Sequence, residues 1–386
     1  MSTTSSPSSD LVSRQSPEPA PQPTQRIMSL DALRGFDMFF IVGMEEVFES
    51  ISEMFPMEPS LNARLQHAPW AGFHFYDLIF PLFAFLIGVS LVFSLTKAVA
   101  AEGKGQASLK IVRRSAILFL FGILVYHGIA NGLDHVRLLG VLQRLALCSC
   151  AAGLAFVWLN TRALVVLTVS LLVGYWAMLT FIPVPGFGAG DFAEGHNLTN
   201  WIDKMYLPFR RWDGDHDPEG ILSTLPAIAS SLLGVFAGLL IRNPSVEPAR
   251  KVRLLLLWGV AGIAAALLWN FQFPIIKKIW TSSFVLLTAG ISSVLLASFY
   301  YLIDVRNHRT WCRPWVWIGT NAITIYLIAA VVSFDGVAKR LVGGNVSAFF
   351  EGIHHGLGNL VIALLGLGCS FLICRFLYNR KIFLRV

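Results

Sequence analysis

Ten long apolar segments constrain the fold of this chain more than any other feature of its sequence. They lie at about residues 30–51, 76–97, 109–127, 138–159, 162–182, 220–241, 252–270, 280–303, 314–333 and 357–378. About 20 apolar residues in a helix span the hydrocarbon core of a bilayer, which is about 30 Å thick. Charged residues make up 14% of the chain, whereas soluble domains contain roughly 25%. The sequence therefore predicts an all-α polytopic membrane protein with about ten transmembrane helices.

The distribution of lysine and arginine predicts the orientation of these helices. An even number of crossings places both termini on one side, and 20 of the 30 basic residues then fall on that side. Cytoplasmic loops are the ones enriched in lysine and arginine, so we expect both termini in the cytoplasm. Basic loops also account for the net charge of +7, and we expect no nucleic-acid partner.

The two ends of the chain differ in composition. Residues 1–26 consist mostly of Ser, Thr, Pro and Gln with few apolar side chains, which is typical of a disordered segment. We therefore predict a disordered cytoplasmic tail over 1–26 and a single transmembrane domain over 27–386.

Three titratable residues lie where the second apolar segment begins. His67 and His74 belong to a polar, aromatic loop, and Asp77 lies just inside the apolar run. Ionisable groups are costly near lipid and are therefore functional candidates. An imidazole can accept a proton from an attacking amine or hydroxyl, and a carboxylate can orient it. The same pattern is typical of an interfacial aromatic belt that includes Trp70, with Asp77 at the start of a helix. Spacing alone slightly favours this structural interpretation.

The first apolar segment carries four carboxylates, at Asp31, Asp37, Glu45 and Glu46. Steps of three residues place Asp31, Arg34 and Asp37 on one helical face, where the arginine can pair with either acid. Four carboxylates on one spanning helix cannot all face lipid, because each would be charged in a hydrocarbon environment. We therefore predict that this helix lines a polar interior.

Other polar residues have two interpretations each. Arg144 could bind a carboxylate or phosphate, or neutralise an acid of the first helix. Arg113 and Arg114 could bind the phosphates of a cytoplasmic cofactor, or act as topology determinants. Asp217–Gly220 is typical of a helix start, which could also bind an anionic group. The five cysteines have no metal-ligand spacing, so we expect no metal.

A set of motifs runs through the hydrophobic part of the chain. The motifs are Ser29–Gly35 (SLDALRG), His67–Trp70 (HAPW), Gly72–Gly88, Gly140–Arg144 (GVLQR), Asp217–Gly220 (DPEG) and, more loosely, Gly319–Ala322 (GTNA). In this order they resemble the heparan-α-glucosaminide N-acetyltransferase-like transmembrane acyltransferases and their bacterial relatives. The resemblance implies transfer of an acetyl group from cytoplasmic acetyl-CoA, as co-substrate, to a sugar on the other side. In that family the histidine of the H-A-x-W motif is catalytic, which corresponds to His67.

The resemblance also implies a candidate site. Asp77 and Glu45 would orient or assist His67, although the lysosomal members carry an asparagine at the position of Glu45. The residues expected to bind acyl-CoA are Arg34, Arg113, Arg114 and Arg144. The residues expected to bind the acceptor, an amino sugar or another glycan, are Trp70, His74, Asp217 and Glu219.

The resemblance to bacterial relatives places the protein in the bacterial cytoplasmic membrane, where it could form a homodimer. The orientation expected from the basic residues places His67 on the outer side. Two other functions stay open from the residues. A proton- or cation-coupled transporter would use the acids of the first segment and Asp77 as a path for the ion. A membrane assembly partner of a glycan-processing machine would have no catalytic residues at all.

Overall fold

The computed structural model describes residues 27–55, 66–126, 128 and 130–384. Over these residues the chain is helical, and its only β-pairings are two isolated bridges. The prediction of an all-α fold is therefore confirmed. The tail predicted over 1–26 lies outside the described residues.

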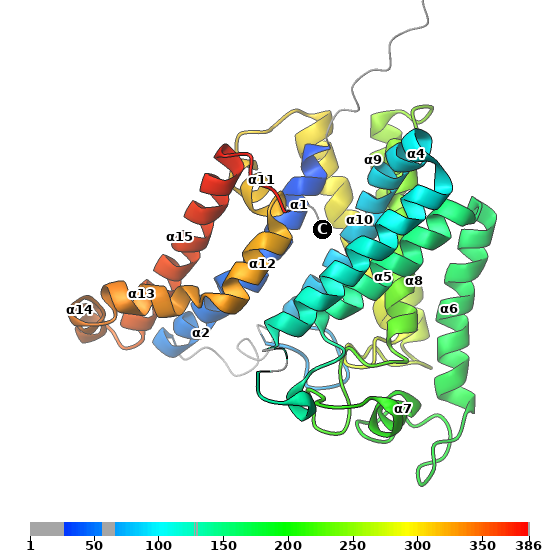
Figure 1. Cartoon of the computed structure of the whole chain (residues 1–386), viewed down its shortest axis with the longest axis horizontal. Helices are drawn as coiled ribbons and strands as arrows, with labels where there is room; N and C mark the ends of the chain where they lie inside the picture. Colours follow the sequence, from blue (N-terminus) through cyan, green and yellow to red (C-terminus); the bar gives the residue numbers. More distant parts are fainter. Residues whose placement is uncertain (1–26, 56–65, 127, 129, 385–386) are drawn as a thin grey trace, which may run out of the picture.

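The helices form two groups that lie beside each other (Figure 1). One group contains α1 (Met28–Phe39), the π-helix η1 (Phe40–Met44), α2 (Glu45–Met54), α11 (Arg313–Gly319), α12 (Ala322–Val331), α13 (Phe334–Val342), α14 (Asn345–Ile353) and α15 (Leu357–Asn379). The other contains η2 (Phe75–Leu78), α4 (Ile79–Val125), α5 (Val141–Trp158), α6 (Thr161–Phe181), α8 (Thr224–Arg242), α9 (Pro248–Trp269), α10 (Ser282–Phe299) and η4 (Tyr300–Val305). The short helices η3 (Leu133–His135) and α7 (Leu198–Tyr206) belong to the loops at one end.

All ten predicted segments coincide with helices, although the described residues contain seven helices that are long and apolar enough to cross a membrane by themselves. An eighth span results if α11 and α12, which meet at a bend of 71°, count as one. Two predicted segments lie in the single element from Phe75 to Val125. The successive elements α1, η1 and α2, which are kinked at Gly43, carry the acids of the first segment and are not among the seven. The number of crossings and the side of the termini therefore stay predictions.

Helix α4 is a hairpin, because it is broken at Gly103. This glycine has φ 80° and ψ 169°, which lie outside the helical region and are readily adopted only by glycine. Leu95 and Ile111 would lie about 24 Å apart along a straight helix, yet they pack in one cluster against α5. The two halves of α4 therefore lie side by side.

Glycines bring the backbones of α4 and α8 into direct contact. A Cβ atom added at Gly88 would lie 1.8 Å from the carbonyl oxygen of Ser231, and one added at Gly234 would lie 2.0 Å from that of Phe85. The Ser231 hydroxyl donates a hydrogen bond to the Ala84 carbonyl at 3.0 Å. Small residues at helix crossings are the usual means of close packing in membranes, where apolar burial supplies little driving force.

Replacing Gly88 with alanine is expected to destabilise the protein by at least about 1–3 kcal/mol, because the two backbones must separate. The matched control is Gly174→Ala in α6, where no atom lies within 4 Å of the added methyl group. Thermal unfolding in detergent should show a lower midpoint for Gly88→Ala only. Equal midpoints for the two variants would contradict the close packing of α4 on α8.

Candidate active site

Asp77 is the residue around which the candidate site is built. Its side chain is fully buried in η2, directly before α4, and its Oδ1 lies 2.9 Å from Nδ1 of His67. Its Oδ2 accepts hydrogen bonds from the backbone N–H groups of Ala68 (3.2 Å) and His74 (2.9 Å). One carboxylate therefore holds the loop and the imidazole in place.

Lys277 is the third member of this group. An antiparallel bridge between Ala71 and Ile276, with a hydrogen bond from Gly72 N–H to the Ile275 carbonyl at 2.9 Å, aligns the two loops. It brings Nζ of Lys277 to 2.8 Å from Nδ1 and 3.3 Å from Nε2 of His67. The same Nζ lies 3.3 Å from Oδ1 of Asp77. Lys277 was not among the predicted site residues, because a basic pair in a loop carries no signal beyond its charge.

The surroundings of Lys277 change its titration. Its side chain is 20% exposed, and burial lowers the pKa of its amine below the ordinary value; the carboxylates of Asp77 and Glu219 offset only part of this effect. Burial disfavours the charged form of any amine, since the ammonium loses its hydration. At a given pH, Lys277 is therefore a neutral amine more often than an exposed lysine is.

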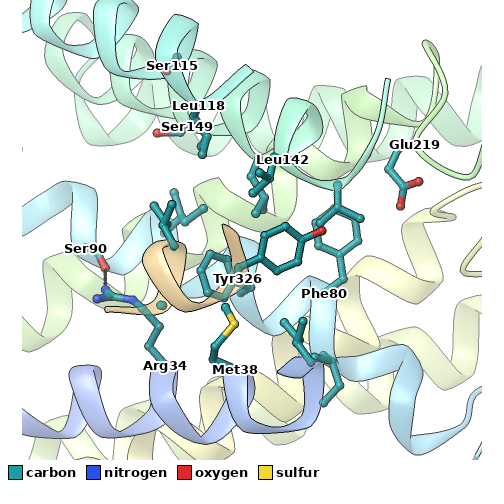
Figure 2. A pocket seen from close by; sticks show the side chains of 18 of the residues that line it. Arg34, Met38, Phe80, Ser90, Ser115, Leu118, Leu142, Ser149, Glu219 and Tyr326 are labelled. Carbon is teal, nitrogen blue, oxygen red and sulfur yellow. Dashed lines mark hydrogen bonds between the residues drawn. The ribbon is translucent and has the colours of Figure 1, made fainter. Parts of the chain in front are cut away.

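The site opens into a cavity of about 740 Å³ between the two groups of helices. Its walls come from α1, α12, both halves of α4 and α5, and its middle section is apolar (Figure 2). The residues of this middle section include Met38, Phe80, Phe83, Leu118, Leu142, Leu145 and Tyr326. The first helix does line this cavity, but Glu45 alone of its four acids does so, and its other lining residues include Met38, Phe40 and Ile41; the predicted polar interior is therefore confirmed only in part.

The two ends of the cavity are polar and differ in character. Near one end lie the basic residues Arg34, Lys110 and Arg114, together with serine hydroxyls from α4 and α5. Arg34 is held in place, because it donates a hydrogen bond to Ser90 Oγ at 2.6 Å and lies 3.5 Å from Asp31. The other end is lined by Glu45, His67, Tyr126, Arg137, Trp212, Asp213, Glu219, Lys277 and Lys278.

Arg137 organises the acidic part of this second end. It forms a bidentate pair with Asp217, at 2.7 and 2.9 Å, and also donates to the Glu219 carboxylate. Its guanidinium lies between two rings, 4.6 Å from the centre of Tyr126 and 4.8 Å from that of Trp212. Burial alone would lower the pKa of Arg137, but the two carboxylates raise it above the ordinary value. Arg137 was missed from sequence, where it is one basic residue in a loop.

Several predicted site residues lie away from the cavity. The buried Arg144 donates to Ser223 and, at 3.4 Å, to the Gly220 carbonyl, so it supports the loop before α8. We therefore leave Arg144 out of the proposed acyl-CoA site. The predicted helix start at Asp217 is wrong, because α8 begins at Thr224; Asp217 is buried against Arg137.

The predicted acceptor residues are similarly divided. Trp70 donates from its indole to the Phe192 carbonyl at 2.9 Å, and Nδ1 of His74 lies 3.0 Å from the Gln66 carbonyl oxygen. Neither residue lines the cavity. Glu219 does, as do Glu45 and Arg114, whereas Arg113 does not.

One group beside the site has donor atoms suited to a metal ion. Glu194, Asp213 and His216 place a ligand atom each within 4.8 Å of one another. Their space is shared with the ammonium of Lys278, which lies 3.0 Å from a carboxylate oxygen of both Glu194 and Asp213. Since a lysine already neutralises these acids, we derive no metal chemistry from the group, and the expectation of no metal stays a prediction.

The sequence matches a known protein family. The sequence model of a family described as heparan-alpha-glucosaminide N-acetyltransferase, catalytic, matches residues 26–269. The chain belongs to this family. The predicted resemblance is thereby confirmed, and the matched stretch contains His67, Asp77 and the arginines at the basic end of the cavity.

Two curated proteins are similar to this chain, and both have one name. Both are heparan-alpha-glucosaminide N-acetyltransferases, from Homo sapiens and Mus musculus. The chain is 27% identical to the human protein over 324 residues and to the mouse protein over 319 residues. Each match covers 68% of this chain and 48% of the relative. The chain therefore spans about half the length of the relatives it matches, and Lys277 and Lys278 lie beyond the stretch that matches the family model.

Proposed function

We propose that this protein is a membrane acyltransferase that moves an acetyl group, or another short acyl group, from cytoplasmic acyl-CoA to an acceptor on the opposite side. The proposed acceptor is an amino sugar or another glycan with a free amine or hydroxyl, and the proposed location is the bacterial cytoplasmic membrane. The main support for this proposal is that one cavity has a basic end and a second end at the His67–Asp77 pair.

The shape and charge of the cavity suit an acyl-CoA donor. Arg34 and Arg114 can bind phosphate groups at the basic end, since arginine forms strong charge-assisted hydrogen bonds with phosphate. The uncharged pantetheine arm can follow the apolar middle section that Figure 2 shows around Phe80, Leu142 and Tyr326. The thioester would then lie beside His67 at the other end.

The chemistry requires a base at His67. When Nδ1–H donates to Asp77, the lone pair of Nε2 is free to accept a proton from the acceptor amine or hydroxyl. The acceptor atom attacks the thioester carbonyl, so a bond from carbon to nitrogen or oxygen forms and the carbon–sulfur bond breaks. The CoA thiolate leaves and takes the proton held by His67. A route through an acetylated His67 has the same net balance and stays open.

The test is binding and turnover with the full chain purified in detergent. We expect saturable binding of acetyl-CoA and release of CoA that depends on an added amine such as glucosamine. The acyl product should contain the acetyl group of the donor. An absence of acetyl-CoA binding, together with proton-coupled flux in vesicles, would overturn the proposal in favour of a transporter.

Two neighbouring arginines give a matched test of the donor site. Arg114→Gln should weaken acetyl-CoA binding by at least about tenfold, since one charge-assisted contact is worth about 1.5–3 kcal/mol. Arg113→Gln should leave the dissociation constant unchanged, because Arg113 does not line the cavity while Arg114 does. Dephospho-CoA should show a smaller difference between the two variants if a phosphate is the bound group. Equal weakening by both variants would contradict this placement of the donor.

A further inference from the structure

The amine of Lys277 stands where the amine of an acceptor would have to stand. Its Nζ lies 3.3 Å from Nε2 of His67, the nitrogen that can accept a proton when Nδ1–H donates to Asp77, and 2.8 Å from Nδ1. It lines the same cavity as His67 and is partly accessible from it. An acyl acceptor needs these properties: contact with the base, access to the thioester and a nitrogen that can lose a proton.

We propose that Lys277 is a self-acetylation site, modified by the acetyl-CoA in the cavity when no external acceptor is bound. This inference rests on the proposed function, since it needs acyl-CoA at His67. It assigns to the protein a covalent modification that would switch off its own site.

The step balances with the donor as the only co-reactant. Nε2 of His67 accepts a proton from Nζ of Lys277, and Nζ attacks the thioester carbonyl. The new bond is an amide between Nζ and the acetyl carbon, the carbon–sulfur bond breaks, and the CoA thiolate leaves with the proton that His67 received. No oxidant, metal or further cofactor enters the balance.

The surroundings of Lys277 favour nucleophilic attack. A neutral amine is required, and burial lowers the pKa of Lys277, so its neutral fraction is larger than that of an exposed lysine. The titratable groups that face it are Asp77, His67, Glu219 and Glu45. Asp77 holds the amine at 3.3 Å and keeps it against the imidazole.

Lys278 provides an internal comparison. It also lines the cavity, but its Nζ lies 3.0 Å from carboxylate oxygens of both Glu194 and Asp213. Burial opposes its charge, but the two carboxylates outweigh this effect and raise the pKa of Lys278. Adjacent lysines therefore differ in the property that acyl transfer needs, with Lys277 prepared to react and Lys278 held as an ammonium.

Acetylation of Lys277 would have a lasting effect on the site. The amide has no charge and is not basic, so it removes the ammonium between Asp77 and the cavity. It also places an acetyl group beside the nitrogen atoms of His67. A bound acceptor would compete with Lys277 for the thioester, so the modification would accumulate only when donor is present and acceptor is scarce.

The experiment uses the full chain in detergent with acetyl-CoA and no acceptor, followed by peptide mass spectrometry over time. We expect one acetyl group on Lys277, gained at least about tenfold faster than on Lys278, because Lys277 contacts His67 and a positioned general base contributes about 10²–10⁴-fold. The rate should fall at least tenfold in His67→Ala, and excess glucosamine should suppress it. Lys277→Arg should remove this acetylated peptide without raising acetylation of Lys278.

The outcomes separate this inference from the proposed function. Turnover with glucosamine while Lys277 stays unmodified without acceptor would overturn the inference and leave the function standing. Acetylation of both lysines at one rate, unchanged by His67→Ala, would also overturn it. If acetyl-CoA neither binds nor reacts, both proposals fall. Hydroxylamine gives a last distinction: an acetyl group on His67 is released by it, whereas the amide on Lys277 is retained.

Discussion

Replacing His67 with alanine is expected to slow acyl transfer by about 10²–10⁴-fold while acetyl-CoA still binds with nearly the wild-type dissociation constant. This range is the usual contribution of a positioned general base. Binding should survive because the proposed phosphate contacts lie at the other end of the cavity, at Arg34 and Arg114. The measurement is the release of CoA with glucosamine as acceptor, beside a direct titration of acetyl-CoA.

His74→Ala is the matched control for this variant. Both histidines belong to the loop that Asp77 orders, but Nδ1 of His74 lies against the Gln66 carbonyl at 3.0 Å and the residue does not line the cavity. Activity within a few-fold of wild type is therefore expected for His74→Ala. Loss of activity in both variants, or in neither, would contradict the assignment of the base. Comparison of their unfolding midpoints shows whether a loss reflects folding instead.

The second large effect is expected for Arg137→Met. This change keeps much of the side-chain volume but leaves Asp217 and Glu219 buried without their cation. Loss of one partner of a buried ion pair typically lowers the free energy of unfolding by about 3–5 kcal/mol. The contacts with Tyr126 and Trp212 are weakened as well. Thermal unfolding in detergent should show a much lower midpoint, or the protein should fail to accumulate in the membrane.

Two further variants make this prediction specific. Arg210→Met removes an exposed arginine from a nearby loop and should change the free energy of unfolding by less than about 0.5 kcal/mol. Adding Asp217→Asn and Glu219→Gln to Arg137→Met removes the uncompensated charges and should restore part of the stability. If the triple variant is less stable than Arg137→Met alone, the paired charges are not the cause of the loss.

The helices were predictable from sequence because their cause is local. An apolar run of about 20 residues can satisfy its backbone in a membrane only as a helix, so hydropathy alone located them. The contact of His67 with Asp77 was also within reach, since the two residues are close in sequence and a buried carboxylate must find donors. The acids of the first helix predicted a polar interior, and the cavity meets this prediction in part, since Glu45 is the one acid of the four that lines it.

The remaining parts of the site depend on contacts between distant residues. Lys277 is 210 positions from His67, and the bridge that aligns their loops has no signature in either segment. Arg137 pairs with Asp217, which is 80 positions away in the sequence. Because of this pairing, a motif that is typical of a helix start fixes the position of a loop instead. Arg144 could not be separated from the cavity arginines for the same reason, because its position is set by how α5 packs on the loop before α8.

The cavity that reaches from Arg114 to His67 has a consequence for how the two sides of the membrane communicate. Under the proposed function, donor and acceptor enter from opposite ends, and only the acyl group passes from one to the other. Neither CoA nor the glycan changes compartment. The protein would then move a functional group across the membrane without moving a whole molecule. An acyl group activated inside the cell would modify a glycan outside it.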